Sequence, residues 1–297
     1  MQRITPCLWF NNNIEDAIGL YTSLFDGSSI GKTARYGKEA ADVSGQKEGA
    51  VMTMMFTLGG QEFMGLNGGP YYQFTPAISL FVNCATADEV ERLWAGLSQD
   101  GLVMMPLDKY PFSEKFGWVQ DRFGVSWQIN LGARKQKINP FLMFVKDKHG
   151  KAGEALEFFV SIFDNAKIES VQRFGPGEHE PEGAVKQGIF TLDGYEFRAM
   201  ESAMDHRFSF TGAISFIVHC DSQEEVDRYW AKLSGSGGKE SMCGWLEDQF
   251  GISWQIVPRV LEKLMEDPKG GRLAMQALLQ MRKLDIKALE AAARAAS

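Results

Sequence analysis

The chain has 297 residues, with 38 acidic and 31 basic side chains, a net charge of −7 and a hydrophobic fraction of 44%. These values are typical of a soluble globular protein of roughly two domains, and the acidic balance opposes nucleic-acid binding. No apolar run approaches the roughly 18 residues of a membrane span, so we expect no membrane partner.

The N-terminal sequence lacks the apolar segment of a secretory leader. The four cysteines (Cys7, Cys84, Cys220 and Cys243) are scattered and show no C-x-x-C spacing. We therefore expect a cytoplasmic protein with reduced thiols.

The first predicted elements are a strand at residues 5–10 and an amphipathic helix. The apolar residues of the helix recur at steps of three and four and share one face: Ile14, Ala17, Ile18, Tyr21, Leu24 and Phe25. The asparagines at 11–13 are natural helix caps.

A strand near residues 30–36 follows, and then a hairpin of residues 50–58 and 61–66. Gly59 and Gly60 separate the two hairpin strands. Glycine takes the positive φ angles that a two-residue turn requires, so the pair predicts a tight turn.

A strand at 78–82 leads into a capping box formed by Thr86 and Glu89. The helix that follows has its apolar face at Val90, Leu93, Trp94 and Leu97. Further strands end in the sequence SWQI. Helices segregated on a mostly antiparallel sheet define an α+β fold.

The same series then recurs. Gly117–Ile129 reads GWVQDRFGVSWQI, residues 244–256 read GWLEDQFGISWQI, and nine of the 13 positions match. Three further segment pairs match in the same order: ITPCLWF with INPFLMF, YTSLFD with FVSIFD, and AISLFV with AISFIV. The chain is therefore two diverged copies in tandem. We predict domains at 1–134 and 135–258.

Residues 259–297 form a third region, in which helix-period segments rich in Ala and Leu lie at 260–265, 273–281 and 286–296. Asp285 is a candidate cap for the last of them. We interpret the region as a helical appendage that packs on the domains. The alternative is a helix that recruits a partner.

Taken together, ITPCLWF, LGGQEFMGLNGGP, FTPAISLFVNC, CGWLEDQFGISWQIVP and QALLQMRKLDIKALEAA resemble the PhnB-like family. That family, often labelled demethylubiquinone methyltransferase, belongs to the glyoxalase/bleomycin-resistance (vicinal-oxygen-chelate) superfamily. The resemblance implies paired βαβββ modules that form a cupped sheet around a small-molecule site in each copy. It also implies a pseudo-dimer within one chain, with a homodimer as a further alternative.

Metal-dependent members of the superfamily bind a metal through four His or Glu side chains. Motif matching places these positions near Thr5/Pro6, Met64, Ala77 and Gln128, and near Asn139/Pro140, Arg198, Ala213 and Gln255. Such residues do not form a metal site. The histidines (His149, His179, His206 and His219) lie elsewhere. We expect no metal and no metal-dependent mechanism.

The methyltransferase label has no support from a motif. An enzyme that uses S-adenosylmethionine usually has a Gly-rich turn from a strand into a helix, followed by an acidic residue. Gly59-Gly60 and Gly68-Gly69 are instead expected in a hairpin and in a loop. We therefore predict no cofactor.

A mixture of aromatic and polar side chains on strands is typical of a small-ligand site. The candidate ligand-binding residues are Trp9, Asn67, Trp118, Gln128, Trp245, Gln255 and Glu201. Each has a structural alternative: Trp118 as core, Gln128 as partner of a backbone group, and Asn67 as a turn residue. Asp121 and Asp248 are expected to cap turns, and no catalytic residue can be assigned.

Three functions remain open. The first is metal-independent small-molecule binding, and the second is a metal-independent enzyme that acts on a small aromatic or quinone-like substrate. The third is a structural or interaction module that depends on the tail. Because Met143 and Glu201 replace Trp9 and Asn67 in the second copy, we expect the two sites to differ.

Overall fold

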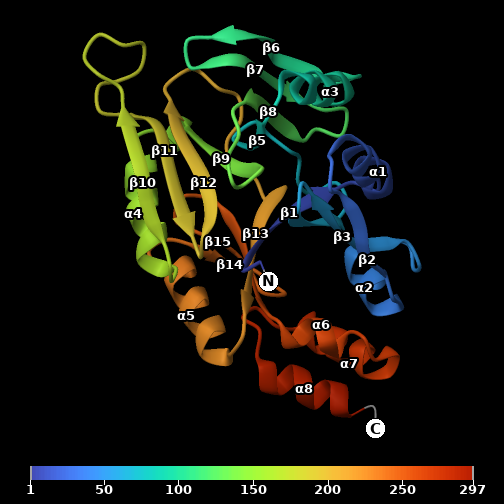
Figure 1. The fold of residues 1–297 in the computed structure, drawn as a ribbon. Helices are drawn as coiled ribbons and strands as arrows, with labels where there is room; N and C mark the ends of the chain where they lie inside the picture. Colours follow the sequence, from blue (N-terminus) through green and yellow to red (C-terminus); the bar gives the residue numbers. More distant parts are fainter. Residues whose placement is uncertain (1, 296–297) are drawn as a thin grey trace.

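The computed structural model describes residues 2–295, which form four modules and a helical tail (Figure 1). The first module contains β1 (Ile4–Phe10), α1 (Ile14–Leu24), β2 (Ser29–Arg35), α2 (Lys38–Ser44), β3 (Val51–Leu58) and β4 (Gln61–Asn67). The second contains β5 (Ile78–Cys84), α3 (Ala87–Ser98), β6 (Leu102–Tyr110), β7 (Ser113–Gln120) and β8 (Ser126–Leu131). Together they make up the first copy.

The second copy repeats this order. Its third module contains β9 (Ile138–Val145), a short 3-10 turn η1 (Lys146–Lys148), α4 (Ala152–Ile162), β10 (Lys167–Arg173), β11 (Val185–Leu192) and β12 (Tyr195–Ser202). The fourth contains β13 (Ile214–Cys220), α5 (Gln223–Ser234), β14 (Lys239–Glu240), β15 (Trp245–Glu247) and β16 (Ser253–Pro258). The tail contains α6 (Val260–Leu264), α7 (Pro268–Leu278) and α8 (Ile286–Arg294). Ala296, predicted in the last helix, lies outside the described residues.

The strands form two eight-stranded sheets, and each sheet combines both copies. Sheet A has the order β14-β15-β16-β13-β1-β4-β3-β2, and sheet B has the order β10-β11-β12-β9-β5-β8-β7-β6. The copies meet at two antiparallel strand pairs, β1 with β13 and β5 with β9. The predicted α+β class with a helical tail is confirmed. The modules, however, pair across the repeat and not within it.

The helices cover one face of each sheet. Helix α1 packs on β3 and β4, α5 on β15 and β16, α3 on β7 and β8, and α4 on β11. The predicted face of α1 is buried at Ile14, Ala17, Ile18 and Tyr21, as the periodicity indicated. Asn13 is the N-cap residue, but its side chain makes no capping hydrogen bond. These contacts build the main apolar core.

Features that depend only on neighbouring residues, a capping box and a hairpin turn, are present as predicted. Thr86 accepts the Glu89 backbone N–H at 3.2 Å, which confirms the capping box. Gly59 and Gly60 have φ angles of 55° and 80°, as a tight hairpin turn requires. The short helix α2 was not predicted.

The two turn aspartates are buried. Asp121 Oδ1 accepts the backbone N–H groups of Phe123 and Val125, and its Oδ2 accepts Trp127 Nε1–H at 2.8 Å. Asp248 makes the same three bonds with the second copy's turn and with Trp254. The expectation that these residues cap turns is confirmed.

The tail packs on the rest of the chain at both ends of sheet A. The carbonyl groups of Met281 and Arg282 accept the backbone N–H groups of Cys243 and Gly244, next to β15. At the other end, Gln276 donates to Glu39 of α2 at 3.0 Å. In Figure 1 the tail helices lie below α2 and to the right of α5. No helix within residues 2–295 is long and apolar enough to cross a membrane.

Candidate functional site

Each sheet has a second face, opposite its core helices, where the alternate strand residues lie. On β1, Ile4, Leu8 and Phe10 join the main core. Because side chains alternate along a strand, Cys7 and Trp9 lie on the second face of sheet A. This face is where a site for a small molecule has to be sought.

Near the middle of sheet A, side chains from four adjacent strands lie close together on the second face. The backbone of Cys7 pairs with Met64 on one side and with Ser215 on the other. Gln255 Nε2 donates to Ser215 Oγ at 3.0 Å. The Cys7 thiol lies against both, and burial raises its pKa to about 12, so it is protonated at neutral pH.

Sheet B repeats this arrangement with different residues. The backbone of Phe141 pairs with Arg198 and with Ser79. Gln128 Nε2 donates to Ser79 Oγ at 2.8 Å, as Gln255 does to Ser215 in sheet A. The Gln–Ser pair is therefore common to both sheets, whereas Cys7 and Met64 are replaced by Phe141 and Arg198.

These residues do not suit the metal that the superfamily implies. Cys7, Met64, Ser215 and Gln255 contain one thiol and no His, Asp or Glu, a poor donor set for zinc or a harder cation. Within residues 2–295, no group of three or more His, Cys, Asp or Glu side chains is placed to hold a metal. His219 bonds Thr5 at 3.1 Å, and burial lowers its pKa to about 4.

The register corrects the sequence matching at two positions. The β1 residue beside Met64 is Cys7, not Thr5 or Pro6, and Ser215 rather than Ala213 faces Cys7. Ala77 and Ala213 precede β5 and β13. Matching the motifs in sequence could not show which residues of neighbouring strands lie opposite each other. It aligns residues along the chain and gives no information on strand pairing.

Two tryptophans from different copies border a cavity of about 430 Å³ at this face of sheet A. The rings of Trp9 and Trp245 meet edge to face, with centroids 5.8 Å apart. Tyr72 contacts Trp9 on another side at 5.0 Å. Trp245 pairs in register with Gln255, so the Trp245 ring lies on the same face of sheet A as the Gln255–Ser215 pair.

The loop after β4 is built around Trp9. Trp9 Nε1 donates to the Gly69 carbonyl at 2.8 Å. A Cβ on Gly68 would lie 2.1 Å from the indole, so only glycine fits there. Gly68 and Gly69 lead into a loop and not into a helix, so they offer no helix N-terminus to S-adenosylmethionine.

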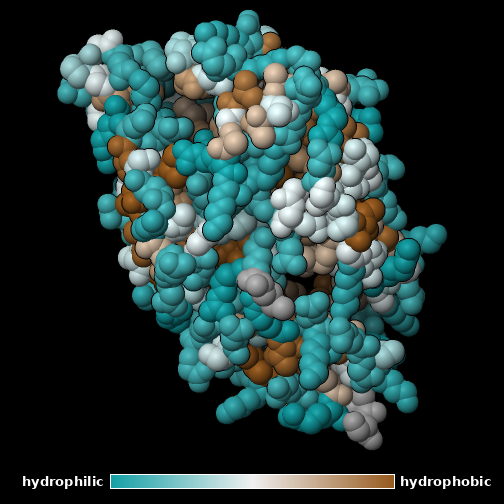
Figure 2. All heavy atoms as spheres, in the orientation of Figure 1, coloured by the Kyte–Doolittle hydropathy of each residue, from teal (hydrophilic) through white to brown (hydrophobic). Residues whose placement is uncertain are grey.

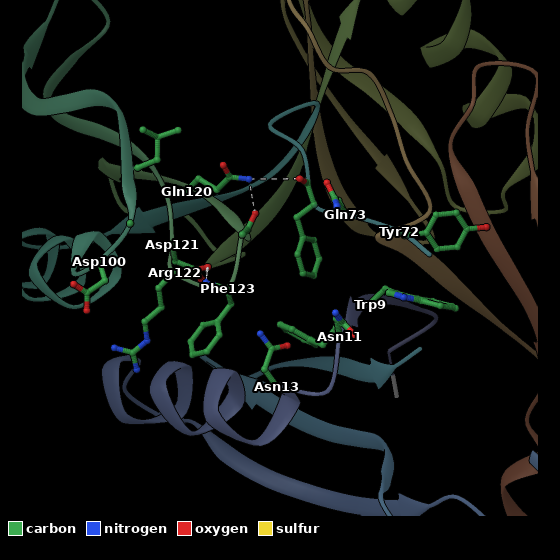
Figure 3. A pocket seen from close by; sticks show the side chains of 15 residues that line it. Trp9, Asn11, Asn13, Tyr72, Gln73, Asp100, Gln120, Asp121, Arg122 and Phe123 are labelled. Carbon is green, nitrogen blue, oxygen red and sulfur yellow. Dashed lines mark hydrogen bonds between the residues drawn. The ribbon is translucent and has the colours of Figure 1, made fainter. Parts of the chain in front are cut away.

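A larger cavity, about 570 Å³, lies on the first copy and shares Trp9 and Tyr72 with the smaller one. Figure 3 shows Trp9 and Tyr72 on one side of it and Arg122 and Asp100 on the other. Amide side chains, including those of Asn11, Asn13, Gln73 and Gln120, line the space between.

The remaining candidate residues are dispersed. Trp118 and Gln128 pair in register on sheet B, where Trp118 donates to Ser126 at 2.8 Å. Asn67 shares the helix-covered face with Phe10 and donates to the Val51 carbonyl at 3.0 Å. We therefore leave Asn67 out of the site at Trp9.

Glu201 also has structural partners. Its carboxylate accepts the backbone N–H groups of Ala152, at the start of α4, and of Val185, at 2.7 and 2.6 Å. Glu201 lines a separate hollow near His149 and Arg173. Sequence reasoning missed Tyr72 and Ser215, although alternation along β13 places Ser215 opposite the core residues Ile214 and Phe216.

Comparison with known proteins agrees with this architecture. Glyoxalase I from Zea mays has a TM-score of 0.57 and 9% identity, covering 89% of this chain and 97% of its own, a likeness of fold alone. The family model described as 3-demethylubiquinone-9 3-methyltransferase matches residues 2–130 and 136–257. The chain thus has the glyoxalase/bleomycin-resistance fold. It belongs to that PhnB-like family.

Two solved relatives correspond to about half of this chain. A PhnB protein from Bacillus cereus is 46% identical and covers 44% of this chain and 100% of its own, with a TM-score of 0.41. A protein from Pseudomonas aeruginosa is 28% identical over 44% of this chain and 98% of its own, with a TM-score of 0.39. No curated protein matches the chain.

Proposed function

We propose that the protein binds a small, neutral aromatic molecule, without a metal, in the cavity bordered by Trp9 and Trp245. The observation that carries the proposal is the meeting of these two indoles from opposite copies beside the Gln255–Ser215 pair. Aromatic walls with a few placed polar groups are the usual composition of a small-ligand site.

The cavity size fits such a ligand. A volume of about 430 Å³ accepts a molecule of one or two fused rings. Tyr72 and Met242, both at the cavity, are partly exposed, so the ligand would enter past apolar side chains. Removing their apolar surface from water under a bound ligand would favour binding.

We also propose that the tandem chain acts as a pseudo-dimer. Each sheet takes four strands from each copy, as a two-fold dimer of single copies would provide. On this proposal, the repeats at 1–134 and 135–258 are the two protomers of a fused dimer, and each site takes residues from both.

An enzyme remains the second candidate, on the strength of the family description alone. The acids nearest the cavity already have partners, because Glu240 accepts Trp230 Nε1–H at 2.7 Å and Glu247 pairs with Lys239 at 2.8 Å. The protonated Cys7 is no nucleophile. These contacts favour binding over catalysis.

Calorimetric titration with 2-naphthol tests the proposal. We expect binding by the wild-type protein and at least a tenfold loss in W9L and in W245L, because aromatic anchors carry a large share of contact energy. W94L, on the core side of α3 and outside both second faces, is the matched control and should bind normally. Undiminished binding in both W9L and W245L would contradict the proposal, and turnover of the probe would favour the enzyme.

A further inference from the structure

The second face of sheet B carries its own apolar cluster, separate from the main core. Phe81, Phe116 and Phe141 are buried in it, and Met105, Tyr110, Trp118 and Met200 are partly exposed around them. Phe81 and Phe141 stack with centroids 6.0 Å apart. In Figure 2, apolar side chains gather near the top of the view, beside the β6–β7 hairpin.

A charged side chain lies within this cluster. The Arg198 side chain is only 5% exposed, and its guanidinium lies 3.9 Å from the centre of the Phe81 ring. One hydrogen bond, from Nη2 to Asn83 Oδ1 at 3.1 Å, satisfies part of its donor set. The Nε–H group is buried and has no partner. A guanidinium has five N–H donors, so Arg198 is under-satisfied.

The charges nearby do not balance it. Glu196 is the nearest carboxylate, at 3.7 Å, too far for a good hydrogen bond, and its Oε1 also has no hydrogen-bond partner. Arg134 approaches the same carboxylate at 3.7 Å. Two cations therefore share one anion, and the site holds an uncompensated positive charge. Burying such a charge is costly unless something pairs with it.

The corresponding place in sheet A has no charge. Met64 occupies the position of Arg198, and Cys7 occupies that of Phe141, whereas the Gln–Ser pair is the same in both sheets. The arginine is therefore not a requirement of the sheet. It is a difference between two otherwise equivalent faces.

We propose that the second face of sheet B binds a small aromatic carboxylate, held by Arg198 and packed on Phe81, Phe141 and Trp118. A guanidinium fork matches a carboxylate in two parallel hydrogen bonds, and the free Nε–H is one arm of that fork. Burial lowers the pKa of Arg198 to about 10, yet the group stays charged at neutral pH. This inference rests on the proposed function, because it takes the second faces of the sheets as ligand sites.

The test compares two probes of one shape, 2-naphthoate and the neutral 2-naphthamide, by titration calorimetry on the full chain. We expect the wild-type protein to prefer the carboxylate by about tenfold or more. R198M should remove this preference, and R198K should keep only part of it because an ammonium is not a fork. M64L, at the equivalent position of sheet A, should leave it unchanged.

Thermal unfolding separates loss of the site from loss of the fold. Replacing an unpaired buried cation with an apolar side chain should leave R198M as stable as the wild type or more so. Equal affinity for both probes, a preference that persists in R198M, or one that disappears in W245L instead would each overturn the inference. Loss of 2-naphthol binding in W9L and W245L tests the sheet A cavity, and loss of the carboxylate preference in R198M tests sheet B, so failure of either proposal is distinguishable from failure of the other.

Discussion

Tyr21 donates its hydroxyl hydrogen to Asp121 Oδ2 across 2.7 Å. The bond links α1, which packs on sheet A, to the β7–β8 turn of sheet B, so it joins the two sheets within the first copy. In the second copy the repeat places Phe159 where Tyr21 stands, and Asp248 has no such phenol. The two copies therefore hold their buried turn aspartates differently.

We expect Y21F to lower the free energy of unfolding by about 1–3 kcal/mol, because it leaves the buried Asp121 carboxylate short of one donor. Urea unfolding measures this change. Y110F is the control, since Tyr110 bonds the Pro106 carbonyl at an exposed site, and a loss of about 0.5 kcal/mol or less is expected there. Equal effects of the two changes would contradict the role of the Tyr21 bond.

Asp248 makes stability depend on pH. Burial raises its pKa from 3.8 to about 7 in the folded protein. Between these values the folded state binds a proton that the unfolded state lacks, so the contribution of Asp248 to stability decreases as pH rises from about 4 to about 7. Comparing wild-type protein with D248N by urea unfolding at pH 5 and pH 8 isolates it. The stability advantage of wild type over D248N should be smaller at pH 8, and an advantage that grows with pH would refute the shift.

Gly68 is expected to tolerate no side chain. In G68A the new methyl group would displace the Trp9 indole, since its Cβ would lie 2.1 Å away. We expect a loss of about 1–3 kcal/mol and weaker 2-naphthol binding. G19A on α1 is the matched change, because a Cβ there meets nothing within 4 Å, and a gain of about 0.5–1 kcal/mol is expected. Normal probe binding by G68A would show that the Trp9 position is unimportant.

Because each sheet combines modules of both copies, we expect the two copies to stay together when the chain is cut between them. A protease site inserted between Arg134 and Lys135 would separate the repeats covalently, but the β1–β13 and β5–β9 pairs would still join them. We expect the cleaved protein to elute as one species of unchanged size in gel filtration. Dissociation into two folded halves in native buffer would show that each copy forms its own sheet.

The sequence predicted the individual helices and turns better than it predicted which strands pair with each other. The α1 face and the Gly59–Gly60 turn depend on neighbours a few residues away, so periodicity and turn chemistry were sufficient to predict them. Whether β1 pairs with β5 or with β13 depends on contacts more than 60 residues away, and the two copies present nearly the same strand patterns. No local signal distinguishes these arrangements.

The candidate site was predictable in part. Trp9, Trp245 and Gln255 do come together, and the repeat indicated that their strands are equivalent. Asn67 does not join them. Alternate residues of β4 lie on the same face, so Asn67 shares the face of the buried Phe63, and this pattern already placed Asn67 on the helix-covered side. The burial of Arg198 could not be predicted from the sequence, because it depends on packing against Phe81 of a strand that is distant in the chain.

A two-fold dimer of single copies must change both of its sites with every substitution. Here each sheet draws on a different module of each copy, so a substitution alters one sheet and leaves its counterpart as it was. Met64 and Arg198 are the visible result, as is a tail that exists once per chain and packs on sheet A. If the chain is a fused dimer, as proposed, selection can change the residues of one site while the other site keeps its own.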